Sequence, residues 1–206
     1  DPPFVADVGI LVSTDPVAVE LIHKYRTNGV ELVLSDFTQK MGIPSVGAMA
    51  WDPKTFPKQS EIVWTAGTMP SATKALCRAL TEVAQLAGDF NSNANYVASG
   101  LPKFPSLEAA DYVIHPGRSV SLGDLPEIGN DNIKVEVERC IAALANRDMD
   151  VFVVDVRHPL LEVPAFYTII PGTQFRERAI HSSVGMIIAK IISNTYTPAQ
   201  AIGGLE

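Results

Sequence analysis

Five polar side chains between residues 74 and 89 have the spacing to share one face of a helix. They are Lys74, Arg78, Glu82, Gln85 and Asp89, separated by steps of three or four residues. At about 100° per residue, such steps place all five on one narrow stripe. A guanidinium and a carboxylate on one stripe can hold a phosphate and a cation. The alternative is an ordinary solvated helix face with an Arg78–Glu82 ion pair.

The same stripe carries two oxygen-bearing side chains one turn apart. Glu82 and Gln85 can direct oxygens at a hydrated Mg²⁺ ion, which prefers oxygen ligands and retains several waters. The spacing therefore makes this pair a candidate metal site, with a surface position for both side chains as the alternative.

Three arginines form a second group of candidates, in the last third of the chain. Arg157 follows an apolar segment, and Arg176 and Arg178 flank Glu177 just after a Pro-Gly turn. The forked donors of a guanidinium suit phosphate oxygens, so these side chains could clamp a phosphate. Exposed loop arginines without a partner are the alternative.

Two aspartates stand where apolar segments end. Asp36 and Asp155 each close a run that we predict to be a strand. In open α/β sheets, ligands bind at the carboxyl ends of the strands. A carboxylate at such a position also caps a loop by accepting hydrogen bonds from local N–H groups. The sequence leaves both interpretations open.

Several function classes find no support in the sequence. The four histidines are scattered, so no zinc-binding pattern exists, and the usual nucleotide and nucleophile motifs are absent. A formal net charge of -7 argues against a nucleic-acid or anionic-membrane surface. No run is long enough to span a bilayer, and we find no signal peptide.

The composition is that of a globular protein. Of 206 residues, 47% are apolar and 19% are charged, which suffices for one sizeable core or two small ones. The only cysteines, Cys77 and Cys140, lie among apolar neighbours in expected helices, so we predict buried, reduced thiols. This cysteine usage predicts a cytoplasmic protein.

The hydrophobic patterning predicts an α/β (α+β) fold with a mixed sheet and packed helices. For the helix after Pro70, Thr68 or Ser71 is the expected N-cap. A later helix should turn Ile133, Val137 and Ile141 inward, with Cys140 and Leu144. We expect a joint at residues 91–106. The predicted helices are 16–28, 70–90, 131–146 and 179–194, and the predicted strands are 5–12, 30–34, 45–51, 61–65, 111–115, 119–122, 151–156 and 163–170.

A similar order of elements occurs twice along the chain. A helix, Gly29, the strand VELVLSD and Pro44 are followed later by a helix, Asp148, the strand DVFVVD and Pro164. The pattern suggests a pseudo-repeat of α/β units, with a ligand cleft where the units meet. The alternative explanation is chance, because helix–strand–turn orders are common in proteins.

Together these segments resemble the YcaO-domain family. The stretch ALCRALTEVAQ (residues 75–85) is similar to its A-x-x-R-A-L-x-E-x-x-Q helix. Upstream, GVELVLSDFT (29–38) and GIPSV (42–46) resemble the segment before that helix. Downstream, VVDVR (153–157), VPA (163–165) and IPG (170–172) resemble its later motifs. The resemblance covers most of the chain in the right order.

The resemblance implies an ATP- and Mg²⁺-dependent enzyme that phosphorylates a peptide backbone amide, which leads to an azoline or a thioamide. It assigns Glu82 and Arg78 as catalytic residues and Glu82 as a metal ligand. Glu82 and Gln85, with Arg157, Arg176 and Glu177, would bind the cofactor. A peptide or protein substrate, a sulfur-donating or substrate-presenting partner and a homodimer would be the partners.

The chain also departs from the family pattern. The family's S-x-x-E-x-x-E-R glutamates are absent, and its Q-x-R continuation is Gln85-Leu86-Ala87 here. We therefore expect residues 1–204 to be the C-terminal portion of a YcaO-like domain that is inactive alone, with Leu205-Glu206 left from cloning. The alternative function is a non-catalytic module that binds or scaffolds a partner protein.

Overall fold

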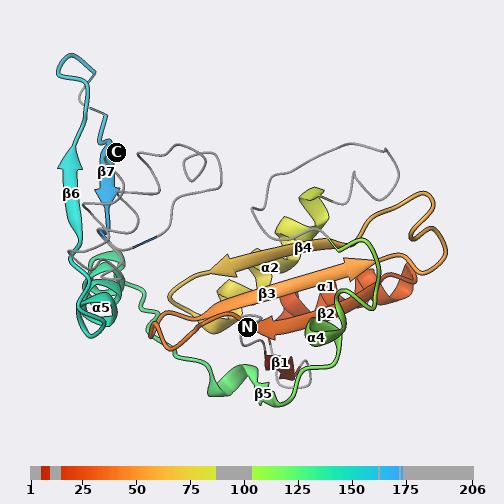
Figure 1. Cartoon of the computed structure of the whole chain (residues 1–206). Coiled ribbons are helices and arrows are strands. Elements are labelled where there is room, and N and C mark those ends of the chain that lie inside the picture. Colours follow the sequence, from red (N-terminus) through yellow and green to blue (C-terminus); the bar gives the residue numbers. More distant parts are fainter. Residues whose placement is uncertain (1–5, 10–14, 87–103, 162, 172, 174–206) are drawn as a thin grey trace, which may run out of the picture. The chain divides into compact units, whose positions relative to one another are not determined.

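The structure is a computed structural model that describes residues 6–9, 15–86, 104–161, 163–171 and 173. The chain divides into two compact units, Asp1–Cys140 and Ile141–Glu206. The predicted helix 179–194, most of the predicted joint, Asp89, Arg176, Glu177 and Arg178 lie outside the described residues. Figure 1 shows the elements in their chain order.

The first unit is built on a five-stranded sheet with the order β4-β3-β2-β1-β5. β1 and β5 are parallel, and the other neighbours are antiparallel, which confirms the predicted mixed sheet. β4 is one edge of this sheet in the described part of the chain. The strands are β1 (Ala6–Gly9), β2 (Glu31–Asp36), β3 (Ser45–Trp51), β4 (Val63–Thr68) and β5 (Ser119–Ser121).

Two helices cover one face of this sheet, α1 (Pro16–Thr27) and α2 (Ala72–Leu86) (Figure 1). Alternate residues of β2, β3 and β4 point toward them, as the period of two requires. Leu34 of β2 and Val46 of β3 are buried there against Leu80 of α2. This cluster is the larger core, and α2 contributes seven buried residues to it.

The opposite face carries an aromatic cluster in which Trp64 packs against Phe37 and Phe104. α4 (Asp111–Ile114) lies against this face. The predicted strand 111–115 is therefore wrong. Ala110 and Val113 are both fully buried, and their spacing of three suits one helical turn better than a strand. The short 3₁₀-helix η2 (Leu122–Asp124) follows β5.

Local signals fix both ends of α1. Asp15 is the N-cap, and its Oδ1 accepts hydrogen bonds from the N–H groups of Val17 and Ala18. Gly29 has φ +75°, the left-handed conformation that ends a helix without steric cost. The Val30 N–H then donates to the Tyr25 carbonyl at 3.0 Å.

The later region contains α5 (Ile133–Ala145) and an antiparallel pair, β6 (Phe152–Asp155) and β7 (Phe166–Ile169). The expectation that α5 buries Ile133, Val137 and Ile141 is wrong for the described part of the chain, since all three are exposed. Periodicity alone identifies an apolar face, but tertiary contacts decide whether it is covered. The described strands form one sheet of five strands and a second sheet of two. These different sheets do not show the predicted pseudo-repeat, which stays a prediction.

Both cysteines are free thiols, and each is only partly buried. Burial nevertheless raises the pKa of both the Cys77 and the Cys140 thiols, which keeps them protonated and unreactive. Within the described residues, no helix combines the length and the apolar character needed to cross a bilayer.

Candidate functional site

The candidate site depends on how firmly α2 is held on the sheet. A Cβ at Gly67 in β4 would lie 2.4 Å from the Ala75 carbonyl oxygen and 2.5 Å from the Ala79 nitrogen. Only glycine permits this close approach of strand and helix. The Thr65 hydroxyl, fully buried, donates to the Ala79 carbonyl at 3.2 Å. Strand β4 thus fixes the middle of α2.

α1 holds α2 from a second side. The Tyr25 hydroxyl donates to the Leu80 carbonyl at 2.7 Å. Burial raises the pKa of Tyr25 to about 12, so the phenol stays protonated and remains a donor at neutral pH. The polar face of α2 is therefore carried on a helix whose position is set by β4 and α1.

A third attachment holds the first turn of α2. The Glu127 Oε2 accepts a hydrogen bond from the Ala72 N–H at 3.1 Å. The expected caps do not do this: the Thr68 hydroxyl is hydrogen-bonded to that of Ser45, and no hydrogen bond of the Ser71 side chain is found among the described residues. The sequence analysis missed Glu127, because 55 residues separate it from Ala72 and no local pattern links them.

The side chains of the predicted polar stripe differ in their exposure to solvent. Lys74, Arg78 and Gln85 are exposed, whereas Glu82 is partly buried. Arg78 and Glu82 form no ion pair, so the expected pair is absent from the described part of the chain. The remaining stripe residue, Asp89, lies outside it.

Lys74 and Arg78 line a cavity of about 350 Å³ between the start of α1 and α2. No carboxylate pairs with either cation in the described part of the molecule. The Asp15 carboxylate shares the lining, but its Oδ1 already accepts two backbone N–H groups. Like charges four residues apart on a helix repel each other, so an anion in the cavity would relieve an unfavourable pair. The full lining is Asp15, Val17, Met69, Thr73, Lys74, Cys77, Arg78 and Thr81.

Glu82 does not line this cavity. It lies one turn beyond Arg78, toward the flank of α2 that carries Ala75 and Ala79 and that Gly67 contacts. Among the described residues, no hydrogen bond or ion pair reaches its carboxylate. A carboxylate without a protein partner remains available to a bound cation, and magnesium prefers such oxygen ligands. Glu82 therefore fits a cation, and Arg78 lies between it and the cavity.

The donor set for a metal ion is sparse. No cluster of three or more histidine, cysteine, aspartate or glutamate side chains exists within the described ranges. Mg²⁺ is nevertheless often held by one or two carboxylates, with phosphate oxygens and waters completing its shell. One glutamate a turn away from two cations that have no carboxylate partner in the described part of the chain is compatible with a magnesium–phosphate ligand.

The aspartates at the strand ends follow the loop-capping interpretation. Asp36 Oδ1 accepts from the Thr38 N–H at 2.8 Å, and Asp155 Oδ1 accepts from the Arg157 N–H at 3.0 Å. The Arg157 guanidinium also pairs with Asp155. This hydrogen-bonded pair lowers the pKa of Asp155 and raises that of Arg157. Arg157 belongs to the second unit and already has a carboxylate partner.

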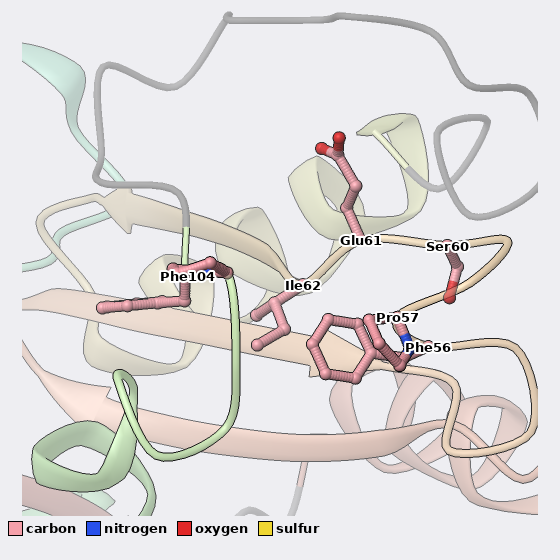
Figure 2. A pocket seen from close by; sticks show the side chains of 7 residues that line it. Phe56, Pro57, Ser60, Glu61, Ile62 and Phe104 are labelled. Atoms are coloured by element: carbon pink, nitrogen blue, oxygen red, sulfur yellow. The ribbon is translucent and has the colours of Figure 1, made fainter.

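A second pocket, of about 430 Å³, lies on the other side of the first unit. Its walls are mainly apolar, and Figure 2 shows the Glu61 carboxylate pointing away from the ring of Phe56 and from Ile62. Among its described lining residues, Ser60 and Glu61 are the polar ones, and no basic side chain accompanies them. We therefore place the candidate site on α2.

Comparison with known proteins identifies the family to which the chain belongs. A family model described as YcaO cyclodehydratase, ATP- and Mg²⁺-binding, matches residues 2–174. The comparison with curated proteins found no match.

Three solved structures share the fold. A heterocyclase in complex with substrate and cofactor superposes with a TM-score of 0.67 at 21% identity, covering 81% of this chain and 23% of that one. The heterocyclase TruD gives 0.64 at 21% identity, covering 84% and 24%. YcaO from Methanopyrus kandleri, bound with AMPPCP and Mg²⁺, gives 0.57 at 20% identity, covering 81% and 44%. The chain thus spans about a quarter of the heterocyclases, and the family model places it in the YcaO cyclodehydratase family.

Proposed function

We propose that this chain is part of an enzyme that uses ATP and Mg²⁺ to phosphorylate a peptide backbone amide, leading to an azoline or a thioamide. The family model and the shared fold support the proposal. The activity belongs to the whole protein, because the chain spans less than half of the structures it matches.

In this proposal α2 is one wall of the nucleotide site. Lys74 and Arg78 attract phosphate oxygens, and Glu82, assisted by Gln85, holds Mg²⁺. ATP would supply a phosphoryl group that turns the amide oxygen into a leaving group. The contribution of the chain itself is to place fixed charges where phosphate charge accumulates.

One observation carries this assignment. A helix fixed by β4 and α1 presents two cations beside a cavity and a partly buried glutamate one turn away, and none of the three has an ion-pair partner among the described residues. Arg78 and Glu82 have the spacing for an ion pair but do not form one among the described residues, so both charges remain available to a ligand.

The remaining site and partner assignments stay part of the proposal. Arg157, Arg176 and Glu177 would contact the cofactor, and Arg157 would first have to leave Asp155. A peptide or protein substrate, a sulfur-donating or presenting partner and a homodimer follow from the family resemblance. A cytoplasmic location follows from the cysteine usage.

The second candidate is a non-catalytic module that binds or scaffolds a partner protein. The missing glutamate motif and the lost arginine after Gln85 favour it. In this case the cavity cations would bind a partner's carboxylates, and Mg²⁺ would have no effect on them.

Calorimetry with AMPPCP on the full-length protein distinguishes the two, with and without Mg²⁺. Glu82→Gln should weaken magnesium-dependent binding about tenfold or more, because it removes the charge that holds the ion. Glu20→Gln is the matched control, since Glu20 is an exposed helical glutamate that pairs with Lys24 on the same helix. Equal affinity in wild type and Glu82→Gln would end the assignment of Glu82, and no binding by wild type would favour the module.

A further inference from the structure

The loop before α5 reaches back across the first unit and seats α2 at its first turn. Ala75 N–H donates to the Ser71 carbonyl, so the N–H groups just before Ala75 have no partner inside the helix. The Glu127 carboxylate supplies one from outside, to Ala72 at 3.1 Å. A negative charge also suits the positive end of the helix.

Further hydrogen bonds hold the loop that contains Glu127. The other oxygen of Glu127 accepts from the Gly129 N–H at 3.1 Å, and the Ile128 N–H donates to the Pro70 carbonyl at 3.0 Å. A Cβ at Gly129 would lie 2.7 Å from the Glu127 carboxylate and 3.3 Å from the Ser71 side chain. An alanine at this position would therefore have to displace the Glu127 carboxylate from its place in the loop.

The first turns of α5 hold the loop from behind. The Arg139 guanidinium donates to the carbonyls of Gly129 at 2.7 Å and Ile128 at 3.3 Å. The Glu136 carboxylate accepts from the Asn130 N–H at 3.0 Å. Residues 127–130 are thus fixed between α5 and the N-terminus of α2.

We propose that Glu127 is a positioning residue for the phosphate-binding end of α2. By fixing Ala72, it sets where Lys74, two residues on, stands at the cavity, whereas β4 holds the turn that carries Arg78. The proposal rests on the proposed function, because it assigns the two cations to a phosphate ligand. Glu127 itself touches no ligand.

The test uses the full-length protein and three variants. Glu127→Ala removes the cap, and Glu127→Gln keeps one carbonyl oxygen for the Ala72 N–H. Gly129→Ala keeps the carboxylate but displaces it. Asp124→Ala is the control, because Asp124 likewise accepts a backbone N–H, from Ser121 at 2.9 Å, within the cap of η2.

The first readout is hydrogen exchange of α2, which needs no ligand. Glu127→Ala and Gly129→Ala should speed exchange at Ala72 and Thr73 about fivefold or more and leave Leu80 and Val83 unchanged. Glu127→Gln should lie between them and wild type. Unchanged exchange at the first turn in Glu127→Ala would overturn the proposal.

The second readout is affinity for Mg²⁺·AMPPCP, measured well below the unfolding midpoint of each variant. Glu127→Ala should weaken binding about fivefold or more, Glu127→Gln should restore part of it, and Asp124→Ala should equal wild type. A purely structural role would lower only the unfolding midpoint, so unchanged affinity in Glu127→Ala overturns the positioning role.

The two proposals fail differently. If wild type does not bind Mg²⁺·AMPPCP, the proposed function fails, and hydrogen exchange alone then decides whether Glu127 seats α2. If wild type binds and Glu127→Ala binds equally, only the positioning role fails.

Discussion

Two regions of this chain have the same kinds of helix end and strand end, but their strands differ in burial. Both α1 and α5 end on a left-handed residue, Gly29 with φ +75° and Asp148 with φ +56°. In each, the next residue donates to a carbonyl five positions back, at 3.0 Å from Val30 and 3.1 Å from Met149. Each region then continues into a strand that ends on a capping aspartate.

The difference lies in what covers the strands. β3 is buried at six of its seven residues, whereas every residue of β6 and β7 is exposed in the described structure. Similar turns and caps therefore occur in both regions, but among the described residues only the first region has helices packed on its sheet. The comparison teaches that the candidate site belongs to the region whose helix is held by tertiary contacts.

The largest expected effect tests this difference in burial. Leu34→Ala, at a side chain 1% exposed, should lower the free energy of unfolding by about 2–5 kcal/mol, because it leaves a cavity in the core. Val153→Ala, at 58% exposure, should cost less than about 0.5 kcal/mol. Urea denaturation measures both. A cost for Val153→Ala near that of Leu34→Ala would show that β6 is covered in solution.

The two helix ends provide a reciprocal test. Gly29→Ala should cost about 1 kcal/mol, because alanine is strained at positive φ. Asp148→Gly should instead stabilise its helix end by up to about 1 kcal/mol, since glycine adopts φ +56° freely. Thermal unfolding of the two variants checks the signs. The same sign for both would mean that the ends are not equivalent.

A smaller effect concerns the phenol that joins α1 to α2. Burial raises the pKa of Tyr25 to about 12. A group with a raised folded-state pKa contributes stability that is complete below its unfolded pKa, about 10, and is lost as the pH rises toward 12. Between pH 9 and 12, wild type should therefore lose more stability than Tyr25→Phe. Parallel losses in both proteins would place the Tyr25 hydroxyl in solvent.

The smallest effect is in the second region. The Arg157 side chain lowers the pKa of Asp155, so the stability that this pair contributes is present above the ordinary carboxyl pKa and fades as the pH falls below it. Arg157→Gln should raise the pKa of Asp155 toward its ordinary range in a carboxyl NMR titration. An unchanged titration would show that the pair does not form in solution, leaving Arg157 free for a phosphate.

Much of the first region could be predicted from residues near one another in sequence. The stops at Asn28 and Gly29, the cap at Asp15 and the strand Ser45–Trp51 follow from local conformational preference and from a hydrophobic period of two. The buried face of α2 follows in the same way, because Leu76, Leu80 and Val83 recur at helical spacing.

The hydrophobic pattern was insufficient to identify α4 as a helix and to predict the exposure of the apolar face of α5. Residues 111–115 contain too few positions to distinguish one helical turn from a short strand, and the contact of Ala110 and Val113 with the sheet decides it. The apolar positions of α5 indicate a face, but they do not say what covers it. Both errors concern contacts with distant residues.

The sequence by itself determined that α2 is a helix with one apolar face and one charged stripe, because backbone preference and side-chain spacing are local properties. Only the tertiary structure decided that this stripe divides, with Lys74 and Arg78 at a cavity and Glu82 on the other flank. It alone brought Glu127 to the first turn of α2. Contacts across 55 residues depend on how the whole unit packs, and no local periodicity encodes them.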